Sequence, residues 1–212
     1  MARQPHELFD TREQKAALEA RNGLLQFEAI ESMALASKGG FTFTASLLCE
    51  LQRLAIQDIY TCAGKMRTGP VFLVRNPPDP NKHQPPPWEQ VVPLVNDMCE
   101  HINCNFMRMS PIQIGAYAMW RINWIHPFFG GNGRTSRAAS YLLLSVRIGF
   151  NLPGLNTIPQ QIEQNSQPYY RALESADLSA KRGPVDLAEM EELLSRLLAS
   201  QLLSIHNRAS SG

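Results

Sequence analysis

The sequence lacks most of the features that mark a secreted, membrane-spanning or nucleic-acid-binding protein. None of its four cysteines forms a Cys-x-x-Cys pair, which argues against a disulfide framework or a zinc site and favours buried free thiols. No apolar run approaches the roughly 18 to 20 residues that a membrane span needs, and the N-terminus lacks the apolar core of a signal peptide. A formal net charge of +1 offers no attraction to nucleic acid or a membrane surface. We therefore expect a cytoplasmic protein with no nucleic-acid partner and no membrane span.

The remaining composition is that of an ordinary globular protein. Hydrophobic residues make up 44% of the 212 residues and charged residues 18%, both within the usual range. The length fits one domain, or one domain with a terminal extension. Because composition carries no functional information here, the function has to be inferred from local patterns.

Most of the chain has the apolar spacing of amphipathic helices. Residues 6–37 predict two helices separated at Asn22-Gly23, because Asn-Gly marks a turn or a helix end. Thr44 is a suitable N-cap, and the run that starts at Ser110 supplies an N-cap, a helix-start proline and a capping-box glutamine at Gln113. Further helices are expected over residues 45–60, 88–105, 111–125, 134–146, 166–178 and 186–205.

The apolar patterns of three of these helices predict which of their residues are buried. Residues 138–146 are apolar nearly all round, which predicts a buried central helix. In the helix of residues 166–178, Tyr169 and Tyr170 are expected to face the interior. The last helix carries an apolar stripe that includes Met190 and Leu194. It can pack on the body of the domain or on a second copy of the chain.

Residues 67–87 are the one segment without helical character. The run from Val71 to Val74 has the composition of a strand, residues 76–80 form a proline-rich turn, and residues 85–87 are three prolines that stop the return strand. This pattern predicts one small β-hairpin, with an irregular surface connection as the alternative. A lone hairpin is marginally stable, so it must lean on the helical body.

The most specific stretch runs from residue 126 to 137 and reads His-Pro-Phe-Phe-Gly-Gly-Asn-Gly-Arg-Thr-Ser-Arg. The preceding helix should stop at His126, because a residue before proline avoids the right-handed helical region. The glycines can take positive φ and let a ligand approach, and Asn132 adds hydrogen-bonding groups. A helix from Arg134 onward turns its free amides toward the loop and places Arg137 on the same face. The stretch predicts a histidine base beside a polyphosphate site.

This stretch resembles the signature of the Fic (filamentation induced by cAMP) family, His-Pro-Phe-x-Asp/Glu-Gly-Asn-Gly-Arg-x-x-Arg. Every fixed position is met except one, where Gly130 replaces the family's carboxylate. The resemblance implies an all-α, Fic-type helical bundle with one small β-hairpin flap. It divides the chain into an N-terminal helical extension (1–23), a Fic domain (24–180) and a C-terminal helix (181–212).

The resemblance also implies an activity, the transfer of AMP from ATP to a Ser, Thr or Tyr hydroxyl of a target protein. It makes His126 the general base, gives Asn132 a catalytic role and has Phe128 anchor the loop. The hairpin flap docks the target by strand addition. The implied phosphate-binding residues are Gly131, Asn132, Gly133, Arg134 and Arg137. The implied target-docking residues are Gly69, Pro70, Val71, Phe72 and Leu73.

Gly130 leaves the metal and the activity open. The family's carboxylate at this position helps to hold Mg²⁺ between the phosphates, so its loss can slow transfer by orders of magnitude. Mg²⁺ can still arrive with ATP, because phosphates and water supply most of its ligands. Three interpretations remain: a slower AMP transferase, an enzyme that uses another phosphate-containing donor, and a non-catalytic nucleotide-binding or scaffold module.

The sequence gives no standard form of the family's internal inhibitor, a glutamate in the motif Ser/Thr-x-x-x-Glu-Gly/Asn. Only partial matches occur, at Glu31 and Glu50, and both fit the solvated sides of amphipathic helices. We therefore expect no standard inhibitory glutamate. A separate inhibitory partner and a homo-oligomer both stay open.

Overall fold

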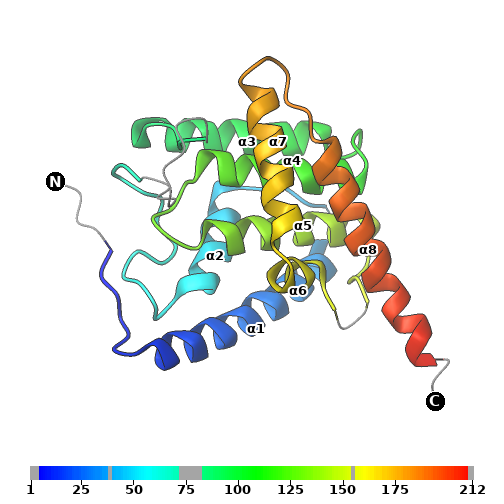
Figure 1. The fold of residues 1–212 in the computed structure, drawn as a ribbon, viewed down its shortest axis with the longest axis horizontal. Helices are drawn as coiled ribbons and strands as arrows, with labels where there is room; N and C mark the ends of the chain where they lie inside the picture. Colours follow the sequence, from blue (N-terminus) through cyan, green and yellow to red (C-terminus); the bar gives the residue numbers. More distant parts are fainter. Residues whose placement is uncertain (1–4, 38–39, 72–82, 154–155, 210–212) are drawn as a thin grey trace.

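The structure is a computed structural model that describes residues 5–37, 40–71, 83–153 and 156–209, with side chains described as far as Ser204. The described residues form an all-α bundle (Figure 1), as the sequence predicts. Within these residues no helix is long and apolar enough to cross a membrane. The helices are α1 (Arg12–Ala36), α2 (Ala45–Ile56), η2 (Trp88–Gln90, a 3₁₀ turn), α3 (Val91–Asn105), α4 (Pro111–Ile125), α5 (Asn132–Ile148), α6 (Ile158–Gln164), α7 (Gln167–Ala180) and α8 (Ala188–Ala209).

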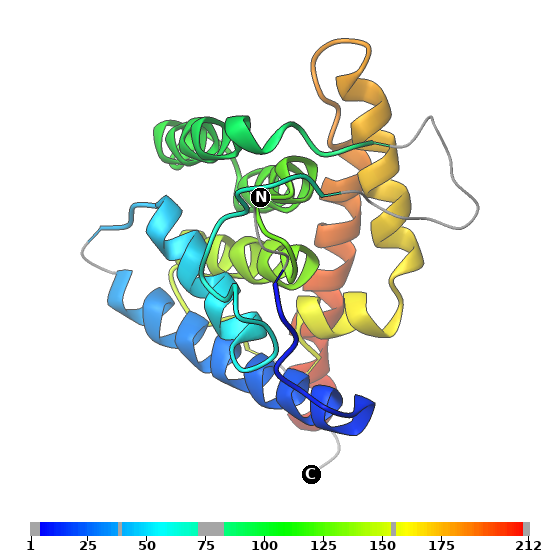
Figure 2. The ribbon, with the colours of Figure 1, turned by 90° about the vertical axis from the view of Figure 1, so that its left-hand side faces the viewer.

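Helix α5 is the centre of the bundle. It packs most extensively on α4, and α1, α2 and α6 also contact it. In Figure 2, α1 and α2 lie on one side of the α4–α5 pair, and α7 and α8 lie on the other. All the α5 side chains from Ala138 to Leu144 are buried. The prediction of a buried helix over residues 138–146 is therefore confirmed.

Helix α1 is continuous, so the predicted break at Asn22-Gly23 is wrong. A capping box at Thr11 and Gln14 starts the helix, which then runs through both residues to Ala36. Asn22 is fully buried, and its side-chain amide donates to the Gln57 carbonyl at the end of α2, 2.7 Å away. This long-range hydrogen bond uses Asn22 inside a helix and outweighs the local preference of Asn-Gly for a turn.

Local capping signals located the starts of α2 and α4. The Thr44 side chain accepts from the Leu47 amide, and Ser110 and Gln113 form a complete capping box. Helix α2 ends at Ile56 rather than near residue 60, since Asp58 takes a left-handed conformation with φ 60°. Helix α6 was not predicted, although Thr157 begins it with another capping box.

Two predictions of burial need correction. Tyr169 is buried, but Tyr170 is 45% exposed because it lies on the outer side of α7. Among the cysteines, Cys99 is buried, whereas Cys104 is exposed near the end of α3. The four thiols are free, as expected, but only one of them is a fully buried core residue.

The C-terminal helix packs on the body of the domain. Met190, Leu193 and Leu194 of α8 are buried in the common core. Farther along, Gln201 is fully buried and donates to the Tyr141 hydroxyl of α5, 2.8 Å away. Figure 1 shows α8 running along one side of the bundle. This face of α8 is therefore occupied by the chain itself rather than by a second copy.

The predicted hairpin flap falls mostly outside the described residues, because residues 72–82, including Phe72 and Leu73, are not described. The flanking described residues 69–71 and 83–87 contain no strand. In the described part of the chain, the β-pairing consists of an isolated antiparallel bridge between Glu7 and Tyr60. The small hairpin of the expected fold is thus not seen.

We predict that Asn22→Ala lowers the free energy of unfolding by about 1–3 kcal/mol, because it leaves a carbonyl at the end of α2 without its buried donor. Urea denaturation measures this change. Ser32→Ala, on an exposed position of the same helix, is the matched control and should shift stability by less than about 0.5 kcal/mol. Equal losses in the two variants would show that the Asn22 hydrogen bond is not what stabilises α1 against α2.

Candidate functional site

His126 ends α4 at the point where the loop of residues 126–131 begins. It is the C-cap residue and takes a left-handed conformation, with φ 50° and ψ 59°. Its amide donates to the Ile122 carbonyl, 2.9 Å away, which closes the last turn of the helix. A left-handed conformation is uncommon for a residue other than glycine, so surrounding contacts must hold it. It turns the chain abruptly from α4 into the loop.

The imidazole of His126 lies in an environment that favours its neutral form. Burial lowers its pKa to about 4, with smaller contributions in the same direction from Arg67 and His83, while a backbone hydrogen bond with Asn123 acts in the opposite direction. Near neutral pH the ring is therefore uncharged. A neutral imidazole has a free lone pair and can accept a proton.

The loop is fixed by its own side chains. Phe128 is fully buried in the core, which agrees with its expected role as an anchor. The Asn132 side chain accepts from the Phe128 amide at 3.0 Å and donates to the Phe128 carbonyl at 2.8 Å. Gln52 of α2 donates to the Gly130 carbonyl at 3.1 Å. Because both ends of the Asn132 amide are occupied, only its backbone N–H remains available to a ligand.

The three glycines between residues 130 and 133 differ in conformation and in the space around them. Among them only Gly131 has a positive φ, 78°, so positive φ explains this glycine and not Gly130 or Gly133. A Cβ atom at Gly131 would lie 2.6 Å from the Ile56 side chain. Gly130 is open by comparison, since a Cβ there would meet only the Tyr60 ring at 3.9 Å.

The N-terminus of α5 is a helix start without a side-chain cap. The helix begins at Asn132, two residues earlier than predicted, and its N-cap is Gly131, which makes no side-chain capping bond. The first-turn amides of a helix have no intrahelical acceptor, and the positive end of the helix dipole lies there. An uncapped helix start beside a neutral histidine is therefore suited to a phosphate or another anion.

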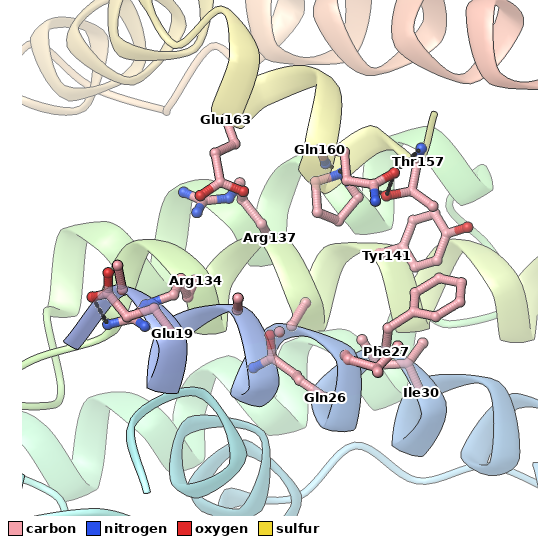
Figure 3. A pocket seen from close by; sticks show the side chains of 16 residues that line it. Glu19, Gln26, Phe27, Ile30, Arg134, Arg137, Tyr141, Thr157, Gln160 and Glu163 are labelled. Carbon is pink, nitrogen blue, oxygen red and sulfur yellow. Dashed lines mark hydrogen bonds and ion pairs between the residues drawn. The ribbon is translucent and has the colours of Figure 1, made fainter. Parts of the chain in front are cut away.

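The two arginines of α5 differ in their contacts (Figure 3). Arg134 donates to the Ala55 carbonyl at 3.0 Å and forms an ion pair with Glu19 of α1 at 3.4 Å. Arg137 makes no hydrogen bond or ion pair to any residue that the structure describes. In Figure 3 the Glu163 side chain of α6 points toward it, from the opposite wall of the same cavity. Arg137 is therefore the guanidinium group that is free to bind a ligand.

The arginines line a cavity of about 690 Å³ between α1, α5 and α6. Its charged end holds both arginines together with Glu19 and Glu163, and its other end is formed by apolar and aromatic side chains (Figure 3). His126 is not among the residues that line it. The lining residues labelled in Figure 3 are Glu19, Gln26, Phe27, Ile30, Arg134, Arg137, Tyr141, Thr157, Gln160 and Glu163.

Four residues at the site were missed from the sequence. Gln52 and Arg67 bind backbone carbonyls of the loop, and Glu19 and Glu163 lie opposite the arginines. No local motif marks any of them, because each acts on residues distant in the sequence. The two glutamates that were weighed as inhibitory residues lie elsewhere: Glu50 pairs with Arg53 at 2.7 Å, and Glu31 does not line the cavity.

The expected target-docking residues are described only in part. Gly69, Pro70 and Val71 are described, and the Gly69 carbonyl accepts from the Arg67 guanidinium at 3.2 Å. The same guanidinium donates to the His126 carbonyl at 2.8 Å. The structure therefore brings the start of this segment close to the end of α4. Phe72 and Leu73 lie outside the described residues.

The described residues contain no cluster of metal-ligating side chains. Within the described ranges, no group of three or more His, Cys, Asp or Glu side chains is placed to hold a metal ion. Position 130 contributes a glycine, Glu19 is paired with Arg134, and Glu163 lines the cavity opposite Arg137. Mg²⁺ prefers oxygen ligands and usually takes one or two carboxylates from a protein. We therefore assign no chemical step to a metal at this site.

Sequence comparison relates the chain to a family of known proteins. The model of the Fic/DOC family matches residues 42–144. The protein adenylyltransferase fic-1 of Caenorhabditis briggsae is 33% identical over 121 residues, which are 57% of this chain and 21% of that protein. The Caenorhabditis elegans protein of the same name is 28% identical over 152 residues, which are 71% of this chain and 27% of that protein. The chain thus spans about a quarter of the length of these curated relatives.

Solved structures share the fold. A Fic domain containing signaling protein from Bacteroides thetaiotaomicron matches with a TM-score of 0.72 and 20% identity, over 92% of this chain and 73% of that one. Fic-1 from Caenorhabditis elegans matches with a TM-score of 0.66 and 24% identity, over 90% of this chain and 52% of that one. At these identities the likeness concerns the fold alone.

We expect His126 to titrate near pH 4 in a histidine NMR titration, well below the ordinary value of 6.5. The His126→Ala spectrum identifies its resonance. Because the unfolded chain binds this proton at a higher pH than the folded chain does, the contribution of His126 to stability is complete above pH 6.5 and is lost as the pH falls toward 4. A midpoint near 6.5 would show that the ring is solvated.

Proposed function

The chain carries a domain of the Fic/DOC family, matched over residues 42–144, and we propose that this domain transfers AMP from ATP to a hydroxyl group of a target protein. One observation supports this most directly: a neutral His126 borders a fixed loop that leads into the uncapped N-terminus of α5. The arrangement combines a proton acceptor with an anion site. The Caenorhabditis relatives, which are named as protein adenylyltransferases, support the same class of reaction.

The proposed reaction uses His126 as the general base. The neutral imidazole accepts the proton of a Ser, Thr or Tyr hydroxyl, and the hydroxyl oxygen attacks the α-phosphorus of ATP. A new P–O bond forms to the target, the bond between the α-phosphate and the β-phosphate breaks, and pyrophosphate leaves. The backbone amides at Gly131, Asn132 and Gly133 stabilise the negative charge on the phosphates, as helix-start amides do in other anion sites.

The two arginines have separate functions in this proposal. Arg137 binds the β- and γ-phosphates, because its guanidinium has no other partner among the described residues. Arg134 holds the Ala55 carbonyl and Glu19, so it can add to phosphate binding only by releasing Glu19. This ion pair is partly exposed, with 27% and 40% of the two side chains accessible. Its strength is modest for that reason, and a polyphosphate can compete with it.

A second candidate function is nucleotide binding without transfer. It is favoured by Gly130, which leaves the loop without the carboxylate that the family signature has there. A third candidate is transfer from another phosphate-containing donor, since the features described above recognise phosphates and not a base. In the second case His126 is dispensable, and in the third ATP fails as the donor while the histidine stays essential.

We expect His126→Ala to reduce transfer from labelled ATP to protein by at least about 100-fold, because it removes the general base. The variant should keep the wild-type fold and the rise in melting temperature caused by ATP. The measurement is label incorporation in a cell lysate and into the chain itself. His101→Ala is the matched control, since His101 is an exposed histidine of α3.

The outcomes separate the candidates. Label incorporation that survives in His126→Ala would overturn the assignment of the base. Thermal stabilisation by ATP in every variant, with no label in any of them, would favour nucleotide binding alone. His126-dependent labelling from a different donor, with none from ATP, would favour the third candidate.

We predict that Gly130→Asp raises the transfer rate by about tenfold or more at a fixed Mg²⁺ concentration and steepens its Mg²⁺ dependence, because an added carboxylate can bind a metal at the phosphates. The site has room, since a Cβ at Gly130 meets only the Tyr60 ring at 3.9 Å. Gly130→Asn has a similar size without the charge and is the matched control. An equal response of both variants would mean that the carboxylate charge has no part in the effect.

A further inference from the structure

Arg67 is a buried arginine that binds the end of α4. Only 2% of its surface is exposed. Its backbone amide donates to the Pro127 carbonyl at 2.8 Å, its Nε donates to the His126 carbonyl at 2.8 Å, and its Nη2 donates to the Ile125 carbonyl at 3.3 Å. Arg67 therefore binds the carbonyl oxygens of consecutive residues 125–127, with His126 in the middle.

The guanidinium also binds two carbonyls outside the α4–α5 loop, one on each side of residues 72–82 in the sequence. Nη1 donates to the Gly69 carbonyl at 3.2 Å and Nη2 to the Pro86 carbonyl at 2.6 Å. These acceptors, like the carbonyls at the end of α4, are neutral backbone groups. Glu89 acts on Arg67 only as a more distant charge. The buried positive charge is thus satisfied by backbone dipoles rather than by a carboxylate.

The end of a helix gives this arrangement its physical basis. The last carbonyls of α4 lack intrahelical donors, and the negative end of the helix dipole lies there. A planar guanidinium offers several donors in fixed directions, so one side chain can satisfy several of these carbonyls at once. A lysine ammonium in its place keeps the positive charge but loses the fixed fork.

We propose that Arg67 is a positioning residue for His126: by binding the carbonyls of residues 125–127 it holds His126 in its left-handed conformation and keeps the imidazole at the start of the loop. Such a conformation is unfavourable for a residue with a side chain, and position 126 is a histidine rather than a glycine. The effect of Arg67 on the ring is independent of any activity. Its effect on transfer rests on the proposed function.

The experiment compares Arg67→Lys and Arg67→Gln with wild type and with the control Arg147→Gln. Arg147 also donates to a backbone carbonyl, that of Met109 at 3.1 Å, but it lies at the far end of α5. Each variant is tested by NMR titration of the His126 ring and by the kinetics of transfer from ATP. The charges near the ring are Arg67 and His83, and both lower its pKa.

Arg67→Gln should raise the pKa of His126, because it removes a neighbouring positive charge, whereas Arg67→Lys should leave it closer to the wild-type value. Both variants should lower kcat by about tenfold or more, since small displacements of a catalytic group are costly. The KM for ATP should stay within about twofold, because the phosphate-binding groups of α5 are untouched. Arg147→Gln should change none of these quantities.

Several results would overturn the proposal. One is a wild-type pKa and kcat in Arg67→Gln, and another is an equal fall of kcat in Arg147→Gln. Failure of both Arg67 variants to fold would assign the residue to the fold instead. If the wild-type protein transfers nothing, the proposed function has failed. A displaced His126 ring resonance in Arg67→Lys, which keeps the positive charge but loses the fork, still supports the positioning role, whereas unchanged His126 resonances in that variant sink it.

Discussion

The packing of α4 against α5 is the constraint on which the candidate site depends. The two helices form the most extensive contact of the bundle, and a short loop joins the end of one to the start of the other. The loop therefore lies where the negative end of the α4 dipole is close to the positive end of the α5 dipole. Each end needs a partner of opposite charge. Arg67 is the partner for α4, and an anion is the natural partner for α5.

The two arginines of α5 differ in whether they are already paired. Arg134 is paired with Glu19 and bound to the Ala55 carbonyl, so it joins α1 and α2 to α5. Arg137 has no such bond within the described residues, although Glu163 faces it across the cavity. A polyphosphate that enters the cavity meets carboxylates as well as guanidinium groups. In the proposed function, the balance between these groups affects how tightly phosphate binds.

The chemistry of the loop rests on a division between backbone and side chains. Asn132, Phe128 and Gln52 use their side chains to fix the loop, which leaves backbone amides as the groups that face a ligand. Gly130 provides neither a side chain nor a charge. The loop is consequently fixed by side-chain hydrogen bonds, has a neutral histidine beside it, and carries no carboxylate at position 130.

The sequence by itself determined the features that depend on neighbouring residues. The N-cap at Thr44 and the capping box at Ser110 placed the starts of α2 and α4, and the all-round apolar pattern identified α5 as buried. The spacing within residues 126–137 predicted a base beside a phosphate site, which stays a prediction. Only the tertiary structure decided that α1 is continuous, because the Asn22 hydrogen bond to Gln57 joins residues 35 positions apart. It also decided the role of Arg67, which lies 59 positions from His126, and the pKa of His126, which burial lowers. Such contacts leave no local pattern, because they depend on which helices pack together and not on the residues adjacent in the chain.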